Sequence, residues 1–328
     1  MRNSRLLAVL GLDFSWHARR PIVWVLLALL LLTSWGLSTG SMRISSGDSA
    51  VGGTKAWLTS EFNNGKMLPL VIFIFYIFFI TILAGLSVVQ DEERKVGEIL
   101  HSTPLHPSEY IWGKFLAVAA ASLAILTAHL AFAAFFNHLV PNPNAEEVRG
   151  PFHLVNYARP AVFLGLPGVL FIAGATFAIG ERSRRPILVF VLPLAALLFC
   201  AFFLWSWTPS WLDPRWNRLL MLLDPAGVRW MSETWLEVDR GVEFYNTQPV
   251  GYDAPFLLSR LAFAALGVLA VAWSARGFGR TLRGGRPRGL RTAVEGERAA
   301  EILGETNAVP DSAAIIEANP DYSRTGVV

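Results

Sequence analysis

Charged residues are scarce in this sequence. Only 16% of the 328 residues are Asp, Glu, Lys or Arg, against about 25% in a typical soluble domain. Hydrophobic residues make up 53% of the chain, and they are clustered. Runs of about 20 apolar residues are long enough to cross a lipid bilayer as helices. The composition therefore excludes a soluble enzyme and indicates an integral membrane protein.

Several motifs of soluble chemistry are also missing. The single cysteine, Cys200, lies inside an apolar run, so neither an intramolecular disulfide nor a cysteine-pair metal site is expected. No G-x-x-x-x-G-K-[ST] motif occurs, so this chain is not expected to hold ATP in a P-loop of its own. No internal repeat of 20–50 residues is visible.

Six apolar runs are predicted to span the membrane as helices, which makes the fold all-α. They cover about Pro21–Ser38, Leu68–Val89, Phe115–Val140, Val162–Gly180, Pro186–Trp205 and Ala254–Trp273. The stretch FSWHARR, directly before the first apolar run, mixes aromatic and basic residues, as an interfacial helix does. We therefore predict a six-helix membrane domain over residues 1–283. The polar residues 284–328 are predicted to form a flexible tail.

The distribution of Lys and Arg predicts the orientation. With the N-terminus in the cytoplasm, cytoplasmic segments carry 16 of these residues and outer segments carry 9. The excess on the inner side follows the positive-inside rule. We therefore expect a multi-pass protein of the cell inner (plasma) membrane with both termini in the cytoplasm.

The outer segment 206–253 is aromatic, with five tryptophans between Trp207 and Trp235. Its apolar part, Leu219–Leu223, is too short to span and is bracketed by Pro214 and Pro225. Two interpretations remain open. The segment forms one or two amphipathic helices in the outer leaflet, or a small cap packed on the helix ends.

Between the second and third apolar runs lies a charged segment, QDEERKVGEILHSTPLHPSEYIWGK. An apolar stripe at helical spacing is formed by Val96, Ile99, Leu100 and Thr103. Pro104 ends this short helix, and Pro107 suits the first turn of the next one. A stripe this narrow fits either a linker on the membrane surface or a helix that docks into a partner's groove.

The same segment resembles the cytoplasmic loop of ATP-binding-cassette exporter permeases of the type-2 class. The similarity covers about 25 residues: an acidic start at Glu92 and Glu93, then Gly97, Glu98–Leu100, a turn at Thr103–Leu105 and Gly113–Lys114. LLDPAGVRWMSE and LLSRLAF also resemble a subgroup whose members are sometimes fused to an aminopeptidase-like domain. No H-E-x-x-H motif occurs, so no peptidase activity is expected.

The resemblance implies that residues 92–103 form a coupling helix on a separate ATPase subunit. Val96, Gly97, Glu98, Ile99 and Leu100 would make that contact, with Thr103 and Pro104 forming the turn that follows. Gly97 would allow close approach, Glu98 would pair with a basic residue, and Glu92 and Glu93 would support the loop. The permease would act as a homodimer or heterodimer. It would need no cofactor of its own and would not be an enzyme.

Two residues inside the apolar runs are candidates for a substrate path. His129 lies within the third run, and Arg260 lies near the outer end of the sixth. As an alternative function, His129 could serve a membrane-embedded enzyme or a metal or haem site. A secondary transporter is a further alternative, but none of the six runs has an acidic residue at mid-depth to couple an ion. For Arg260, snorkelling to the interface and contact with the outer segment remain open.

Overall fold

The computed structural model describes residues 2–42, 57–93, 105–141, 147–183, 186–209 and 211–282. These residues form helices and no strand, which confirms the all-α prediction. In chain order the elements are α1 Arg2–Ala18, α2 Pro21–Thr39, α3 Glu61–Val71, the π-helical turn η2 Ile72–Tyr76, α4 Ile77–Glu93, α6 Pro107–His138, α7 Val155–Pro160, η4 Ala161–Gly165, α8 Leu166–Ser183, α9 Pro186–Phe199, η5 Cys200–Trp205, α10 Pro214–Leu223, α11 Val228–Met231, η6 Ser232–Leu236, α12 Val242–Thr247 and α13 Ala254–Leu282.

Six helical stretches of the described chain are long and apolar enough to cross a membrane. They are Pro21–Thr39, Glu61–Gly85, Pro107–His138, Val155–Ser183, Ile187–Trp205 and Ala254–Gly279. The six predicted helices are thus confirmed, although three of them begin before the apolar runs that predicted them, the third at Pro107 as its proline indicated. Polar residues in these early turns have partners on neighbouring helices: Glu61 pairs with Arg159, for example. Hydropathy alone places such residues outside the span, whereas paired polar groups can be buried.

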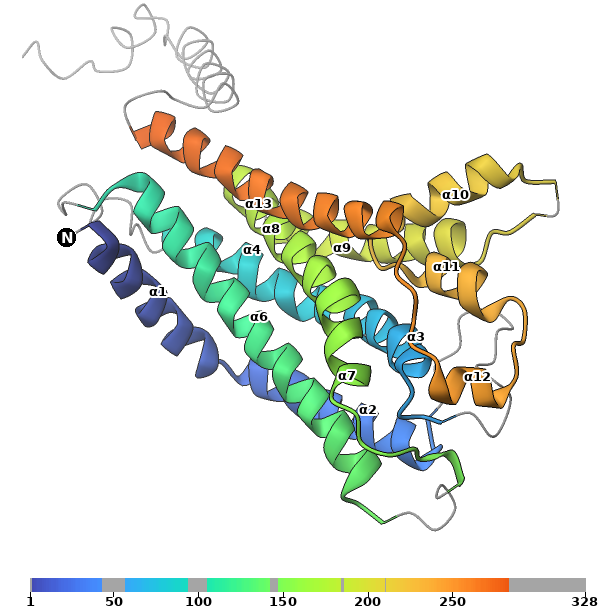
Figure 1. The fold of residues 1–328 in the computed structure, drawn as a ribbon. Helices are drawn as coiled ribbons and strands as arrows, with labels where there is room; N and C mark the ends of the chain where they lie inside the picture. The colour runs from blue at the N-terminus through green and yellow to red at the C-terminus, as the bar shows by residue number, and fades with distance from the viewer. Residues whose placement is uncertain are drawn as a thin grey trace, which may run out of the picture. The chain divides into compact units, whose positions relative to one another are not determined.

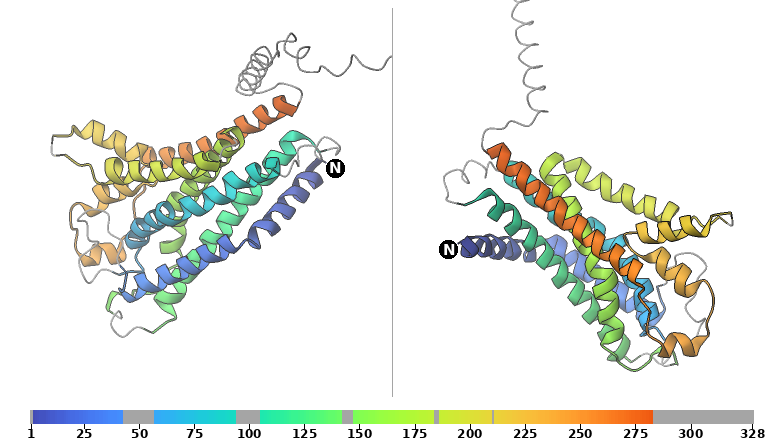
Figure 2. Two further views of the ribbon diagram at one scale, coloured as in Figure 1. Left: turned by 180° about the vertical axis from the view of Figure 1, so that it is seen from behind. Right: turned by 45° about the horizontal axis from the view of Figure 1, so that its top comes forward.

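The helices run between two ends that the figures separate clearly (Figures 1 and 2). At one end, which we call the loop end, the end of α4 meets the start of α6, and α8 ends beside them. At the opposite end, which we call the cap end, α10, α11 and α12 cover the helices. The chain forms two compact units, Met1–Gly277 and Phe278–Val328, and both ends described here belong to the first.

Glycines allow the closest contacts between spanning helices. A Cβ atom on Gly174 of α8 would lie 2.2 Å from the carbonyl oxygen of Gly267 in α13. A Cβ atom on Gly180 would lie 2.8 Å from the carbonyl oxygen of Gly85 in α4. Small residues at such crossings let two backbones touch, as is common in membrane helix packing. α8 is therefore packed directly against both α4 and α13.

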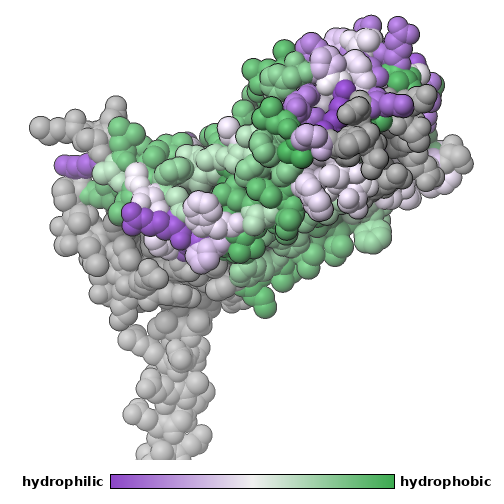
Figure 3. Space-filling model, turned by 90° about the horizontal axis from the view of Figure 1, so that it is seen from below, coloured by the Kyte–Doolittle hydropathy of each residue, from purple (hydrophilic) through white to green (hydrophobic). Residues whose placement is uncertain are grey.

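The surface has the polarity that a spanning protein requires. In Figure 3 hydrophobic residues cover the middle of the visible face, and hydrophilic residues gather toward its two ends. Large apolar side chains are exposed on α9 and α13, including Phe190, Leu194, Leu261 and Leu269. In a bilayer these side chains meet lipid, so their exposure to solvent here needs no other explanation.

The N-terminal helix is longer than FSWHARR alone predicts. α1 runs from Arg2 to Ala18 and packs along the first half of α6 (Figure 1). Gly113 of α6 makes room for it, since a Cβ atom there would lie 2.7 Å from Val9. The predicted N-terminal helix is thus present, and it packs on α6, a spanning helix of 32 residues.

Candidate functional site: the coupling-loop ends and the cap

The predicted coupling residues lie largely beyond the part of the chain that the structure describes. Glu92 and Glu93 are the last two residues of α4. Residues 94–104 are outside the described residues, and they include Val96, Gly97, Glu98, Ile99, Leu100, Thr103 and Pro104. The structure therefore defines the two helix ends that the loop joins, and the loop contacts stay a prediction.

The helix after the loop starts where the sequence predicts, at Pro107. His106 precedes it as the N-cap, and its ring nitrogen accepts from the Ser108 amide at 3.4 Å. Glu109 reaches back to accept the His106 amide at 3.0 Å, which completes a capping box. Two of the amides that have no partner inside the helix are thereby satisfied. The loop thus re-enters the helical bundle at a fixed point.

Lys114 joins three helices at the loop end. It is 4% exposed. Its ammonium donates to the carbonyl oxygen of Ser87 in α4 at 3.3 Å and pairs with the Asp13 carboxylate of α1 at 3.0 Å. A buried ammonium is costly unless it is paired, so these contacts hold α1, α4 and α6 in one arrangement. The sequence identified Gly113 and Lys114 as part of a motif, but their partners in α1 and α4 were missed.

A fully buried histidine, His17, lies in the last turn of α1. Neither ring nitrogen has a hydrogen-bond partner among the described residues. Burial, together with the nearby charges of Arg20 and Lys114, lowers the pKa of His17 from 6.5 to about 4. The ring is therefore neutral at physiological pH. Its position beside two cations could have been suspected only after α1 was placed against α6.

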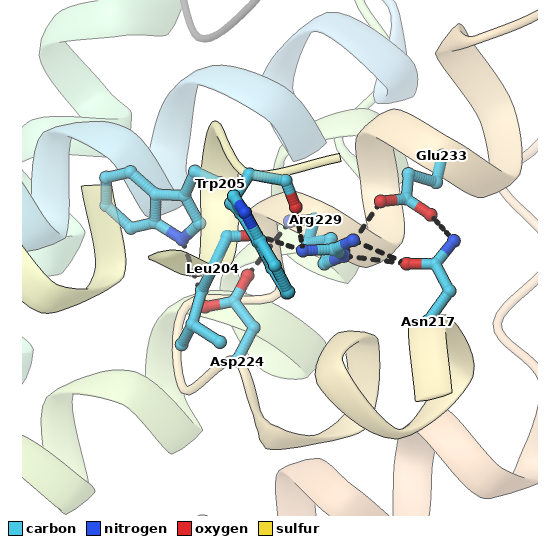
Figure 4. A network of polar contacts seen from close by, with 7 residues as sticks. Leu204, Trp205, Asn217, Asp224, Arg229 and Glu233 are labelled. Atoms are coloured by element: carbon cyan, nitrogen blue, oxygen red, sulfur yellow. Dashed lines mark hydrogen bonds and ion pairs between the residues drawn. The ribbon is translucent and has the colours of Figure 1, made fainter. Parts of the chain in front are cut away.

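At the cap end, Arg229 is buried and fully paired (Figure 4). Its guanidinium donates twice to the Asn217 side-chain oxygen, at 2.9 and 2.6 Å, and pairs with Glu233 at 2.7 Å. It also donates at 3.0 Å to the carbonyl oxygens of Leu204 and Trp207. Burial raises the pKa of Glu233, while its hydrogen bond from Asn217 and the Arg229 charge oppose that shift. This network joins the end of η5 to α10, α11 and η6.

The turn between α10 and α11 is fixed by a second buried charge, Asp224. Its carboxylate accepts from the Trp205 indole at 3.1 Å and from the backbone amide of Arg229 at 2.9 Å (Figure 4). It also accepts from the backbone amide of Ala226 at 3.0 Å. Gly227 completes the turn with φ of 77°, a conformation that favours glycine. Asp224 therefore holds both the preceding spanning helix and the next helix of the cap.

Arg260 of α13 binds the same turn. It is 2% exposed. Its guanidinium donates to the carbonyl oxygens of Asp224 and Pro225, the latter at 2.8 Å, and lies over the rings of Phe256 and Phe263. The sequence left two roles open for Arg260, snorkelling to the interface and contact with the outer segment. These hydrogen bonds are a contact with the outer segment. A role for Arg260 in a substrate path stays a prediction.

The outer segment combines features of both interpretations. α11, η6 and α12 build a packed cap whose core is the buried set Phe62, Leu164, Trp230, Met231, Leu236, Tyr245, Val250 and Phe256. α10 contains no fully buried residue and exposes Trp216, Leu219 and Leu223. The segment thus has three helices where one or two were predicted. Apolar contacts with α3 and α13 bury the two later helices.

Comparison of the sequence with models of known protein families identifies the family of this chain. Residues 56–225, slightly more than half of the chain, match the sequence model of the ABC-2 family transporter proteins. The chain belongs to this family. No match was found among curated proteins. The chain is therefore a membrane transport permease, and members of the family normally work with an ABC ATPase subunit.

The match covers the features that the ABC-2 permease shares with its family. It includes α3 to α10, the undescribed segment 94–104 and the Asp224 turn. α1, α2 and α13 lie outside it, and yet α1 supplies Asp13 and His17, and α13 supplies Arg260, to the features described above. The subgroup with an aminopeptidase-like domain stays a resemblance.

His129 of the permease lies buried on α6, 5% exposed. Its ring faces Tyr76 of η2 with the centroids 5.9 Å apart. The His129 Nδ1 and the Tyr76 hydroxyl have no hydrogen-bond partner among the described residues. His138 is bonded elsewhere, to the Tyr157 hydroxyl at 3.0 Å. Within the described ranges, no group of three His, Cys, Asp or Glu residues could hold a metal ion.

Proposed function

We propose that this ABC-2 permease is the membrane half of an ATP-driven exporter and that residues 92–103 dock on a separate ATPase subunit. The proposal goes beyond the family membership: the resemblance of the loop to that of type-2 exporters supports ATP coupling and export, and the Lys and Arg bias supports the orientation in the membrane. Both termini would then be cytoplasmic in the inner membrane, and ATP would be held by the partner. A pair of permeases, identical or different, would enclose the path.

One observation carries the coupling part of the proposal: the base of the loop is held to three helices by Lys114. The Ser87 carbonyl is within one or two turns of the end of α4, and Lys114 is in the second turn of α6. A displacement of the loop would therefore reach α4, α6 and, through Asp13, α1 at once. Closure of an ATPase dimer could by this route bias the permease between two conformations.

Co-purification tests the docking. The permease would be expressed with the ABC ATPase encoded nearest to it and isolated through a tag on the permease. Gly97→Trp and Glu98→Arg are expected to lose the ATPase, because one blocks close approach and the other reverses a charge. Glu237→Arg is the matched control, since Glu237 is exposed at the cap end. Retention of the ATPase by both loop variants would contradict the proposal.

Vesicle transport tests the direction. The complex would be reconstituted so that only ATPase subunits on the outside of the vesicle meet ATP. An exporter is expected to move a fluorescent amphiphile into the vesicle lumen after ATP is added. Amphiphiles are the first class to test because the spanning helices are apolar, although lipid-facing surfaces share that character. Movement out of the lumen would assign import instead.

A further inference from the structure

A groove separates α8 and α13 on the loop side of their glycine contact. The helices touch at Gly174 and Gly267. Beyond this contact both continue toward the loop end, and a volume of about 450 Å³ lies between them. The groove is lined mainly by apolar side chains and ends on a cation: its lining includes Ala175, Ala178, Ile179, Ala270, Trp273 and Arg182. This volume falls within the range of roughly 300–1,000 Å³ that holds small ligands.

The cation at the end of the groove has no carboxylate partner in the described part of the chain. Arg182 is exposed, and its guanidinium stacks over the Trp273 ring at 3.9 Å. The neighbouring acid, Glu181, is buried and accepts from the Ser274 hydroxyl at 2.8 Å. Glu181 is also the single acidic residue in α8 and α13. The mouth of the groove is therefore complementary to an anion.

The position of the groove indicates which anion can reach it. Arg182 lies at the end of the spanning stretch Val155–Ser183, and the alanines lie one or two turns deeper. The face of α13 beside the groove exposes Leu266, Leu269 and Trp273, which is 56% exposed. A tryptophan and an arginine at the end of a span are typical of the membrane interface. The groove therefore opens sideways into one leaflet, with its charge at headgroup depth.

We propose that this groove binds one anionic membrane phospholipid. An acyl chain fills the apolar part between α8 and α13, and the phosphate is held by Arg182. Arginine suits phosphate because its planar guanidinium can donate two parallel hydrogen bonds. Basic pockets between membrane helices are a known setting for such headgroups. The site does not depend on ATP coupling or on the direction of transport.

A second copy of the permease is a poorer occupant for this groove. A two-fold contact centred on it would bring the same face of both copies together, so one Arg182 would approach the other. Neither α8 nor α13 offers an exposed carboxylate to neutralise that pair. Charge complementarity thus favours the phospholipid.

Native mass spectrometry tests the proposal on the full-length permease. The protein would be purified in mild detergent and equilibrated with either phosphatidylglycerol or phosphatidylcholine. Wild-type permease is expected to retain one phosphatidylglycerol after the others are removed, and to bind it more tightly than phosphatidylcholine. Arg182→Gln is expected to weaken retention of phosphatidylglycerol about fivefold, the effect of one basic side chain at a membrane surface. Arg19→Gln, at an exposed arginine outside the groove, is the charge control.

A second variant tests the apolar part of the groove. Ala175→Phe places a large ring in the groove and is expected to abolish retention of the single lipid, whereas Ala265→Phe, at an exposed position of α13 outside the lining, is expected to preserve it. Unchanged elution and melting of the variants would show that they fold. Equal retention of the two lipids by wild type, or normal retention by Arg182→Gln, would overturn the proposal. Dissociation of a permease dimer by Ala175→Phe with lipid retention unchanged would assign the groove to a second copy instead.

Discussion

The two ends of the bundle treat buried charge differently. At the cap end, Arg229, Arg260 and Asp224 are each almost fully buried, and each makes several hydrogen bonds within the chain, although the Arg260 Nε atom has no hydrogen-bond partner among the described residues. At the loop end, Lys114 contacts Ser87 and Asp13 of two other helices, and Arg182 is exposed and stacks on Trp273 with no carboxylate partner in the described part of the chain. The buried charges of the cap are thus held by several hydrogen bonds each, whereas the loop end presents an exposed cation, Arg182, to a ligand.

This difference has a physical consequence. A network in which buried charges each make several hydrogen bonds favours one arrangement and is costly to disturb. Helix ends joined by few contacts can shift with a smaller loss of free energy. We therefore expect the cap to move as one piece while the loop end adapts to a partner or a lipid. The four predictions below test this comparison, from the largest expected effect to the smallest.

The largest loss of stability is expected from Arg229→Ala. It leaves Glu233 and Asn217 half-buried without their partner, and breaking a buried pair costs roughly 3–5 kcal/mol. The midpoint of thermal unfolding in detergent, followed by size-exclusion chromatography, measures the change. Arg218→Ala is the matched control because Arg218 is exposed on α10. Equal midpoints for the two variants would show that the cap network does not stabilise the protein.

Acid is expected to destabilise the loop end through His17. Its pKa is about 4 in the folded protein and 6.5 when unfolded, so the unfolded state binds more protons between these values. Stability should therefore rise by roughly 2–3 kcal/mol as the pH increases from 4 to 6.5. His17→Gln cannot titrate and should lose that part of the pH dependence. Melting midpoints at several pH values give the comparison, and parallel curves for wild type and variant would refute the prediction.

Gly174 and Gly168 of α8 are expected to differ in how much an alanine substitution destabilises the protein, because only Gly174 lies at the contact with α13. Gly174→Ala should cost about 1–3 kcal/mol, because its Cβ atom would overlap the Gly267 carbonyl. Gly168→Ala is the control, since the nearest atom to its Cβ is 3.7 Å away on Phe73. There alanine should be neutral or slightly stabilising, as glycine costs conformational entropy in a helix. Thermal midpoints that fall equally for both would show that the close approach is not needed.

The smallest effect is expected at the contact of Lys114 with α1. A double-mutant cycle of Lys114→Met and Asp13→Asn should give a coupling energy of about 1 kcal/mol, toward the lower end for contacting residues, because the cycle isolates the Asp13 contact while the ammonium also donates to Ser87. Thermal stability of the four proteins supplies the cycle. The single variants should keep the ATPase in the co-purification but lower its response to substrate. Strict additivity of the two changes would mean that α1 is not joined to the loop base through this pair.

The sequence by itself determined the class of fold, the six spanning helices and the start of the third at Pro107. It could do so because a membrane selects for apolar length and because proline has a strong preference at the first turn of a helix. The loop motif also indicated the family before the match to the ABC-2 transporter proteins confirmed it. These signals are local, so they survive without any knowledge of packing.

Only the tertiary structure decided which polar residues are partners. Asp13 and Lys114 are distant in sequence, as are Asp224 and Arg260, and no local pattern pairs them. The early start of the second helix at Glu61 has the same origin, since its carboxylate is buried by Arg159 and the Val250 amide. The groove beside Arg182 likewise exists only because Gly174 and Gly267 bring two helices together and the alanines beyond them leave space. Burial of a charge depends on what lies across from it, and the fold alone determines that.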